Sequence, residues 1–141
     1  ILELLRVQET SGRRLLLIVD DGLGSVDFKT QPWLRLSTTG RQYRISLFIA
    51  SQFMHRLPNH LRMNAHYVCA LKTTNDNEKK LLMNEYRIGL TKPQFEEMLE
   101  SSTHDYGALL INNRSSSTRP EDVYTRIRAN PNEGRGVVLR Y

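Results

Sequence analysis

Two adjacent carboxylates, Asp20 and Asp21, are the side chains of this chain best suited to chemistry, because an apolar run leads directly into them. The run, residues 15–19, is continuous and ends in β-branched types, which is typical of a strand buried on both faces. A turn rich in glycine, residues 22–25, then ends the strand. Open α/β sheets hold ligands at the carboxyl ends of such strands, where acids suit a metal ion or an attacking water. Alternatively, the acids mark only the point where the chain leaves the core.

The elements that must position these acids alternate between strand and helix. Further apolar runs predict strands at residues 45–51, 67–71, 106–111 and 123–128. Helices are predicted at residues 1–7, at 32–37 with Gly40 as C-terminal cap, at 61–65, at Asp76–Tyr86, and from the capping box of Thr91 and Gln94 to about Leu99. Apolar strands that alternate with helices predict an α/β class with a mainly parallel sheet, as one domain over residues 1–141.

The composition is that of a globular domain, with 39% hydrophobic and 25% charged residues in a chain of 141. No apolar stretch approaches the length of a transmembrane segment. Cys69 is the only cysteine, so no internal disulfide can form and a reducing compartment fits. Its apolar neighbours predict an inert core thiol. Trp33, Phe48 and Phe53 are likewise expected in the core rather than as platforms for stacked bases.

The middle of the chain is basic and free of acids. The net charge is +5 and the isoelectric point about 9.6. No Asp or Glu occurs between Asp27 and Asp76, whereas that stretch contains Lys29, Arg35, Arg41, Arg44, Arg56, Arg62, Lys72 and the histidines 55, 60 and 66. This distribution favours a polyanion: nucleic acid, nucleotide phosphates or both. The alternative is a solvated basic face that balances acids elsewhere in a larger chain. The histidines and Cys69 lack the spacing of zinc ligands.

Several short motifs follow one another in a specific order: Asp20-Asp21, Thr39-Gly40-Arg41, Ser51-Gln52, Leu57-Pro58, and Leu61-Arg62-x-Asn64. In this order the chain resembles the viral DNA-packaging ATPases of the poxvirus and giant-virus type, which belong to the FtsK/HerA branch of P-loop ATPases. The likeness is closest over residues 15–71 and continues more weakly through 107–112 and 124–128. It implies a RecA/FtsK-like three-layer sandwich with a mainly parallel sheet, here partial and beginning at the Walker B strand.

The resemblance implies a role for each matching residue. Asp20 would hold Mg²⁺ through water, and Asp21 would polarise the attacking water. Gln52 would sense the γ-phosphate of ATP. Arg41 would be an arginine finger that acts on nucleotide bound to a neighbouring subunit. Arg44 is the alternative finger.

Other matching residues are expected at surfaces. Arg62 and Asn64 are expected at an interface, and Arg44 and Arg56 join them as candidates for contact with DNA or a neighbouring subunit. Each assignment has a plainer alternative: Asp21 as a loop cap, Arg41 as a surface arginine, and Gln52 as a partner for backbone groups at a strand end.

The resemblance further implies ATP and Mg²⁺ as cofactors, and double-stranded DNA, a homo-oligomeric ring and capsid or portal components as partners. The location would be the virion or the virus factory of the host-cell cytoplasm. Two other functions stay open. One is a cellular or plasmid DNA translocase with the same chemistry, and the other is a non-catalytic module for nucleic-acid binding or ring assembly.

The phosphate-binding loop, G-x-x-x-x-G-K-[ST], does not occur in the 141 residues. We therefore expect the chain to be the carboxyl-terminal portion of a longer ATPase, and inactive by itself. In this class the first strand lies between the two strands expected at residues 45–51 and 67–71. Without that strand both should expose ladder edges and apolar faces, so we expect poor solubility.

Overall fold

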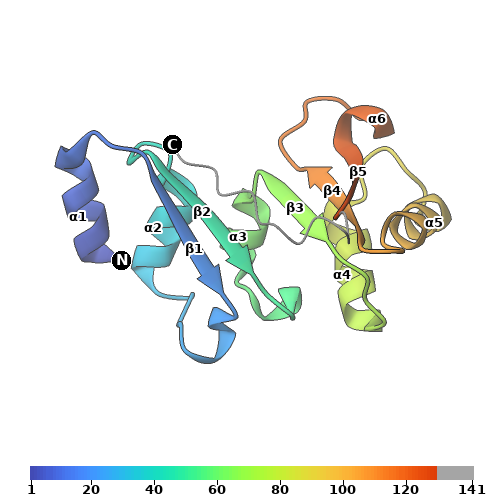
Figure 1. Ribbon diagram of the computed structural model, residues 1–141, viewed down its shortest axis with the longest axis horizontal. Helices are drawn as coiled ribbons and strands as arrows, with labels where there is room; N and C mark the ends of the chain where they lie inside the picture. The colour runs from blue at the N-terminus through green and yellow to red at the C-terminus, as the bar shows by residue number, and fades with distance from the viewer. Residues whose placement is uncertain (130–141) are drawn as a thin grey trace. The chain divides into compact units, whose positions relative to one another are not determined.

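The computed structural model describes residues 1–129 (Figure 1). The chain divides into two compact units: unit 1 is Ile1–Ala65, and unit 2 begins at His66. Within the described part of the chain, every helix is too short or too polar to span a lipid bilayer.

Unit 1 contains a parallel pair of strands and the helices that pack against it. Its elements are α1 (Leu2–Ser11), β1 (Leu15–Asp20), the 3₁₀ turn η1 (Gly22–Gly24), α2 (Gln31–Thr39), β2 (Ile45–Ala50), the 3₁₀ turn η2 (Met54–Arg56) and α3 (Asn59–Asn64). Strands β1 and β2 pair in parallel from Leu15 opposite Ile45 to Asp20 opposite Ala50. The predicted strands are confirmed here, and so is their parallel direction.

One face of the β1–β2 pair is covered by a hydrophobic core. Buried side chains from all three helices, the η1–α2 loop and β2 form this core: Leu5, Phe28, Trp33, Leu36, Ile45 and Leu61. The alternate residues Leu15, Leu17, Val19, Leu47 and Ile49 pack against it from the strands. This arrangement holds the carboxyl ends of β1 and β2 next to each other.

The opposite face of the pair is bare, so the prediction of strands buried on both faces is wrong for the described unit. Leu16 is 57% exposed, Ile18 59% and Phe48 55%. Alternation along each strand points these side chains away from the helices, and nothing in unit 1 covers them. Phe48 is therefore not a core residue, whereas Trp33 is buried as predicted and Phe53 is half-buried.

Unit 2 is built on an antiparallel sheet. Its elements are β3 (Tyr67–Ala70), α4 (Asp76–Tyr86), α5 (Lys92–Ser102), β4 (Gly107–Asn112), α6 (Pro120–Val123) and β5 (Tyr124–Arg128), with strand order β3-β4-β5. Both pairings are antiparallel. The prediction of a mainly parallel sheet thus holds for β1 and β2 but not here, because apolar runs reveal strands without revealing their partners.

The helices of unit 2 begin where local signals predict. Thr91 caps α5 with the predicted box, since its backbone N–H donates to Gln94 Oε1 at 2.9 Å. Helix α4 has the predicted bounds, and Asn75 accepts hydrogen bonds from its first turn. Cys69, in contrast, is exposed rather than a core thiol, because β3 turns this side chain away from the buried residue Ala70. Partial burial nevertheless raises the pKa of the thiol.

Candidate functional site at the carboxyl ends of β1 and β2

The parallel pairing brings the predicted carboxylates and the predicted sensor to one edge of unit 1. Asp20 is the last residue of β1 and lies opposite Ala50, the last residue of β2. The pairing extends one step further, since the Asp21 N–H donates to the Ala50 carbonyl at 3.2 Å. Gln52 follows two residues later. The three side chains are exposed, so this edge is open to a ligand.

The backbone at Asp21 turns sharply. Asp21 has φ 49°, in the left-handed region, and stands at the start of η1 without a side-chain hydrogen bond to that turn. The alternative that Asp21 serves as a loop cap therefore finds no support. Gly22 is buried, and a Cβ on it would lie 2.6 Å from Cγ1 of Val19. A residue without a side chain is thus needed directly after the two acids.

Gln52 sits on a bend that its neighbour stabilises. The Phe53 N–H donates to Ser51 Oγ at 3.3 Å, which turns the chain away from β2. Among residues 1–129, Gln52 makes no side-chain hydrogen bond, so the alternative that it satisfies strand-end backbone groups is not supported. Carboxylate and amide oxygens at one open edge suit a hard divalent cation together with the phosphates of a nucleotide.

The candidate arginine fingers lie at the other end of the strand pair. Arg41 and Arg44 belong to the turn between α2 and β2, and Arg44 has φ 55° in the left-handed region. The Arg44 guanidinium donates to the Gly12 carbonyl, which ties this turn to the turn before β1. At about 3.3 Å per residue, the six residues of β1 separate the two ends by about 17 Å. Neither arginine can reach Asp20 of its own chain.

The remaining predicted residues make local contacts around η2 and α3. Arg62 donates to the Leu57 carbonyl, and Asn64 Nδ2 donates to the His60 carbonyl at 2.8 Å. Arg56 stacks over the Phe53 ring, 4.8 Å from its centroid. These contacts shape the segment after Gln52, and the predicted interface and DNA roles stay predictions.

His60 is a linking residue that the sequence pattern did not reveal. Its Nδ1 lies 3.0 Å from Ser37 Oγ in α2, and its Nε2 lies 3.1 Å from the Phe28 carbonyl oxygen. Phe28 closes the loop after the carboxylates and packs on Trp33, with 4.8 Å between the ring centroids. His60 therefore connects α3 and α2 to the loop that carries Asp21. Only its position between Leu-Pro and Arg-x-Asn could have suggested a role.

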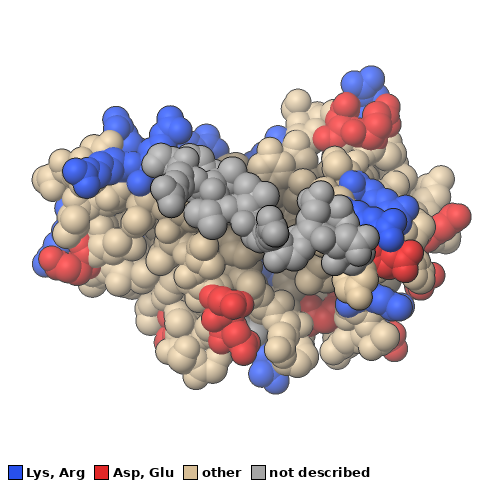
Figure 2. Space-filling model, in the orientation of Figure 1, with Lys and Arg blue, Asp and Glu red and all other residues tan. Residues whose placement is uncertain are grey.

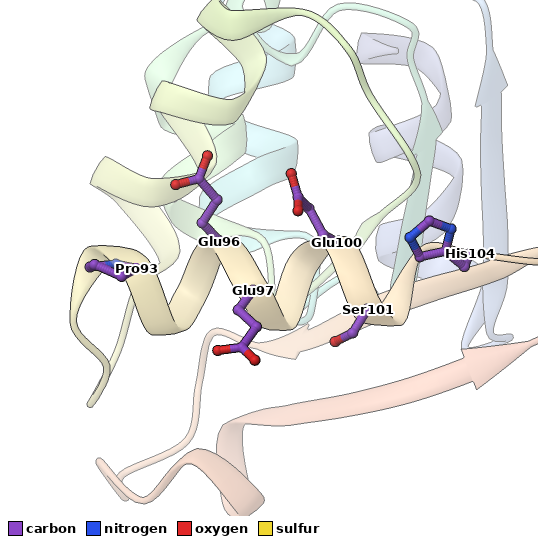
Figure 3. A pocket seen from close by; sticks show the side chains of 6 residues that line it. All are labelled: Pro93, Glu96, Glu97, Glu100, Ser101 and His104. Atoms are coloured by element: carbon purple, nitrogen blue, oxygen red, sulfur yellow. The ribbon is translucent and has the colours of Figure 1, made fainter.

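A shallow hollow along α5 in unit 2 contains none of the predicted residues. Figure 3 shows its lining side chains, Pro93, Glu96, Glu97, Glu100, Ser101 and His104. Glu96 and Glu100 point to the same side of the helix, and Lys79 Nζ lies 3.7 Å from Glu100 Oε1. Three carboxylates give this hollow a negative potential, which disfavours nucleotide phosphates. The chemistry expected of this chain therefore belongs to unit 1.

Comparison with known proteins points in one direction. A protein-family model described as "Poxvirus A32 protein" matches residues 2–121. The uncharacterized protein L437 of Acanthamoeba polyphaga mimivirus is 31% identical over 111 residues, which are 76% of this chain and 39% of that protein. The chain thus spans well under half the length of this relative. Both matches are to viral proteins, in agreement with the predicted viral origin.

Proposed function

The chain belongs to the poxvirus A32 protein family, and from that premise we propose that it is part of an ATP-hydrolysing motor of the FtsK/HerA type that packages double-stranded DNA into viral capsids. One observation carries the proposal. The β1–β2 pairing gathers Asp20, Asp21 and Gln52 at one open edge and leaves Arg41 at the opposite edge. Hydrolysis between neighbouring subunits requires this arrangement, in which one subunit supplies the carboxylates and the next supplies the arginine.

Each residue at the carboxylate edge has a task in this proposal. Asp20 fits a magnesium ion, because such sites need only one or two carboxylates beside the substrate phosphates. When bound, the ion would neutralise charge on the phosphates of ATP. Asp21, held by its left-handed backbone, orients and polarises the attacking water. Gln52 donates its amide N–H to the γ-phosphate or to that water.

Arg41 acts on the nucleotide of the next subunit. The separation of about 17 Å along the strand rules out its own site. A contact between one end of a subunit and the opposite end of the next is heterologous, and such contacts build rings when the rotation closes. An arginine that completes a neighbour's site in this way is worth about 10³-fold or more in rate.

The phosphates of ATP must be held by a loop that these 141 residues do not contain. We propose that the segment carrying this loop adds a strand to the sheet and a helical layer that covers the bare face of Leu16, Ile18 and Phe48. Apolar strands exposed on one side are typical of a parallel sheet that lacks its second layer.

A mixing experiment tests the proposal. The chain joined to its phosphate-binding segment is prepared as Asp20→Asn and as Arg41→Ala, and phosphate release is measured for each variant and for their mixture. Each variant alone should lose at least about 100-fold in rate. The mixture should recover activity, because some interfaces then pair an intact Asp20 with an intact Arg41.

Arg6→Ala is the control, because Arg6 is exposed on α1 and, within residues 1–129, pairs only with Glu3, at 3.8 Å. It should keep the unmodified rate. Recovery that fails to appear in rings shown to contain both variants would refute the action of Arg41 on a neighbour. Full activity of Asp20→Asn would refute the carboxylate site itself.

Two alternatives are less favoured. A cellular or plasmid translocase would share this chemistry, but the two matches are viral. A non-catalytic module for nucleic-acid binding or ring assembly agrees with the missing phosphate-binding loop. A non-catalytic module, however, does not explain why Asp20, Asp21 and Gln52 lie together at an exposed end of the strands.

A further inference from the structure

Two turns of unit 1 form one surface at the amino ends of the strands. The first, residues 12–14, joins α1 to β1, and the second, residues 40–44, joins α2 to β2. The Arg44 guanidinium donates to the Gly12 carbonyl, and the Leu15 N–H donates to the Arg44 carbonyl at 3.0 Å. These contacts run in both directions between the turns, so the side chains of both are presented together.

This surface, which we name the arginine corner, carries four exposed arginines: Arg13, Arg14, Arg41 and Arg44. Figure 2 shows Lys and Arg side chains gathered over this end of unit 1. The acids on α1 do not neutralise it, because Glu9 pairs with Arg35 at 3.2 Å and Glu3 with Arg6. The other acids of unit 1 are at residues 20, 21 and 27, beyond the opposite ends of the strands. Among residues 1–129, none of these acids pairs with Arg13 or Arg14, so these two arginines give the corner a positive charge.

The chemistry of the first turn, residues 12–14, fits phosphates better than a protein partner. This turn carries no exposed large apolar side chain. Stable protein interfaces have an apolar, aromatic centre, which is absent from this turn. Guanidinium groups bind phosphate oxygens through paired hydrogen bonds, and contacts to a nucleic-acid backbone need no apolar centre.

We propose that Arg13 and Arg14 of the arginine corner bind the phosphate backbone of double-stranded DNA without reading its sequence, while Arg41 keeps its role at the neighbouring subunit. Within residues 1–129 the side chains of Arg13 and Arg14 make no hydrogen bond or ion pair, whereas Arg44 is engaged with Gly12. The choice of duplex DNA rests on the proposed function. The positive charge of the corner is independent of the proposed function.

Binding of a labelled 30-base-pair duplex tests this inference. Fluorescence anisotropy is recorded without ATP over a series of NaCl concentrations. The variant Arg13→Gln with Arg14→Gln is compared with Lys80→Gln with Arg114→Gln, which removes the same charge from exposed positions of unit 2. The first variant should bind about 10- to 100-fold more weakly, and its slope of log K against log salt should be smaller by about 2. The second should bind within about threefold of the unmodified chain.

Three outcomes would overturn the inference. Equal losses in the two variants would mean that only net charge matters, and no loss in either would exclude the corner. A corner variant that binds DNA normally but no longer assembles, or no longer hydrolyses ATP when assembled, would assign the arginines to a neighbouring subunit. If the chain joined to its phosphate-binding segment binds DNA as expected but hydrolyses no ATP, the proposed function alone is refuted.

Discussion

The Nε2 atom of His60 lies 3.1 Å from the carbonyl oxygen of Phe28. This contact joins α3 to the loop that follows the candidate carboxylates. The other ring nitrogen lies 3.0 Å from Ser37 Oγ, so one imidazole serves a helix and a loop at once. With the proton on Nε2, the ring donates to the Phe28 carbonyl, and Nδ1 lies beside a serine hydroxyl that also donates to the Leu34 carbonyl at 2.9 Å.

Replacement of His60 by Ala should destabilise unit 1. Loss of the half-buried ring would leave the Phe28 carbonyl without this hydrogen bond, and such losses cost about 1–3 kcal/mol. Urea denaturation, followed by the fluorescence of the single tryptophan, Trp33, measures the change. His104→Ala, at an exposed position of unit 2, should change the free energy of unfolding by less than about 0.5 kcal/mol. Equal effects of the two substitutions would contradict a stabilising role of His60 between α3, α2 and the loop of Phe28.

Polar substitutions at two neighbouring residues of β1 should change the free energy of unfolding by very different amounts. Ile18→Thr, on the bare face, should change the free energy of unfolding by less than about 0.5 kcal/mol and reduce aggregation. Leu17→Thr, against the core, should cost about 2 kcal/mol or more. Light scattering and thermal melts of the 141-residue chain measure both. A soluble, cooperatively melting monomer of the unmodified chain would contradict the expected poor solubility.

The hydroxyl of Tyr124 predicts a pH dependence in unit 2. It accepts from the Ile88 N–H at 2.6 Å and donates to the Tyr86 carbonyl at 2.9 Å. Burial raises the pKa of Tyr124 above its ordinary value, and this outweighs the lowering by the Ile88 hydrogen bond and by the charge of Arg87. Folding therefore favours the protonated phenol. Its contribution to stability is complete below about pH 10 and is lost as the pH rises through the pKa of the folded state.

Tyr124→Phe should remove that alkaline loss and should cost about 1–3 kcal/mol at neutral pH, because the Ile88 N–H loses its acceptor. Denaturation between pH 7 and 11 measures both effects. Tyr106→Phe, at a side chain that is 74% exposed, is the control and should keep the pH profile of the unmodified chain. A profile of Tyr124→Phe that falls as steeply as that of the unmodified chain would exclude Tyr124 as the titrating group.

Local signals in the sequence predicted local structure well. The helix Asp76–Tyr86 and the capping box of Thr91 depend on contacts within a few residues, and both are confirmed. The approach of Asp20 to the end of β2 was also predictable, because parallel neighbours align their carboxyl ends.

Long-range features were not predictable in the same way. The antiparallel pairing of β3, β4 and β5 depends on which strands meet, and an apolar run does not encode its partner. The exposure of Phe48 and Cys69 depends on what covers each sheet face. Gly40 caps α2 as predicted, but its φ is −52°, and the positive φ of this turn is at Arg44. The residue types of the turn do not reveal which position takes the left-handed backbone.

The arginine corner and the two carboxylates lie at opposite ends of the strand pair, so the charge of unit 1 is distributed unevenly. In dilute salt the field of the corner attracts a polyanion before contact and favours its approach from that end. At physiological ionic strength the screening length is about 8 Å, shorter than the roughly 17 Å between the two ends of the strand pair. The two ends then act independently, so the field no longer orients the polyanion before it meets unit 1. The correct orientation must instead be selected by direct contacts.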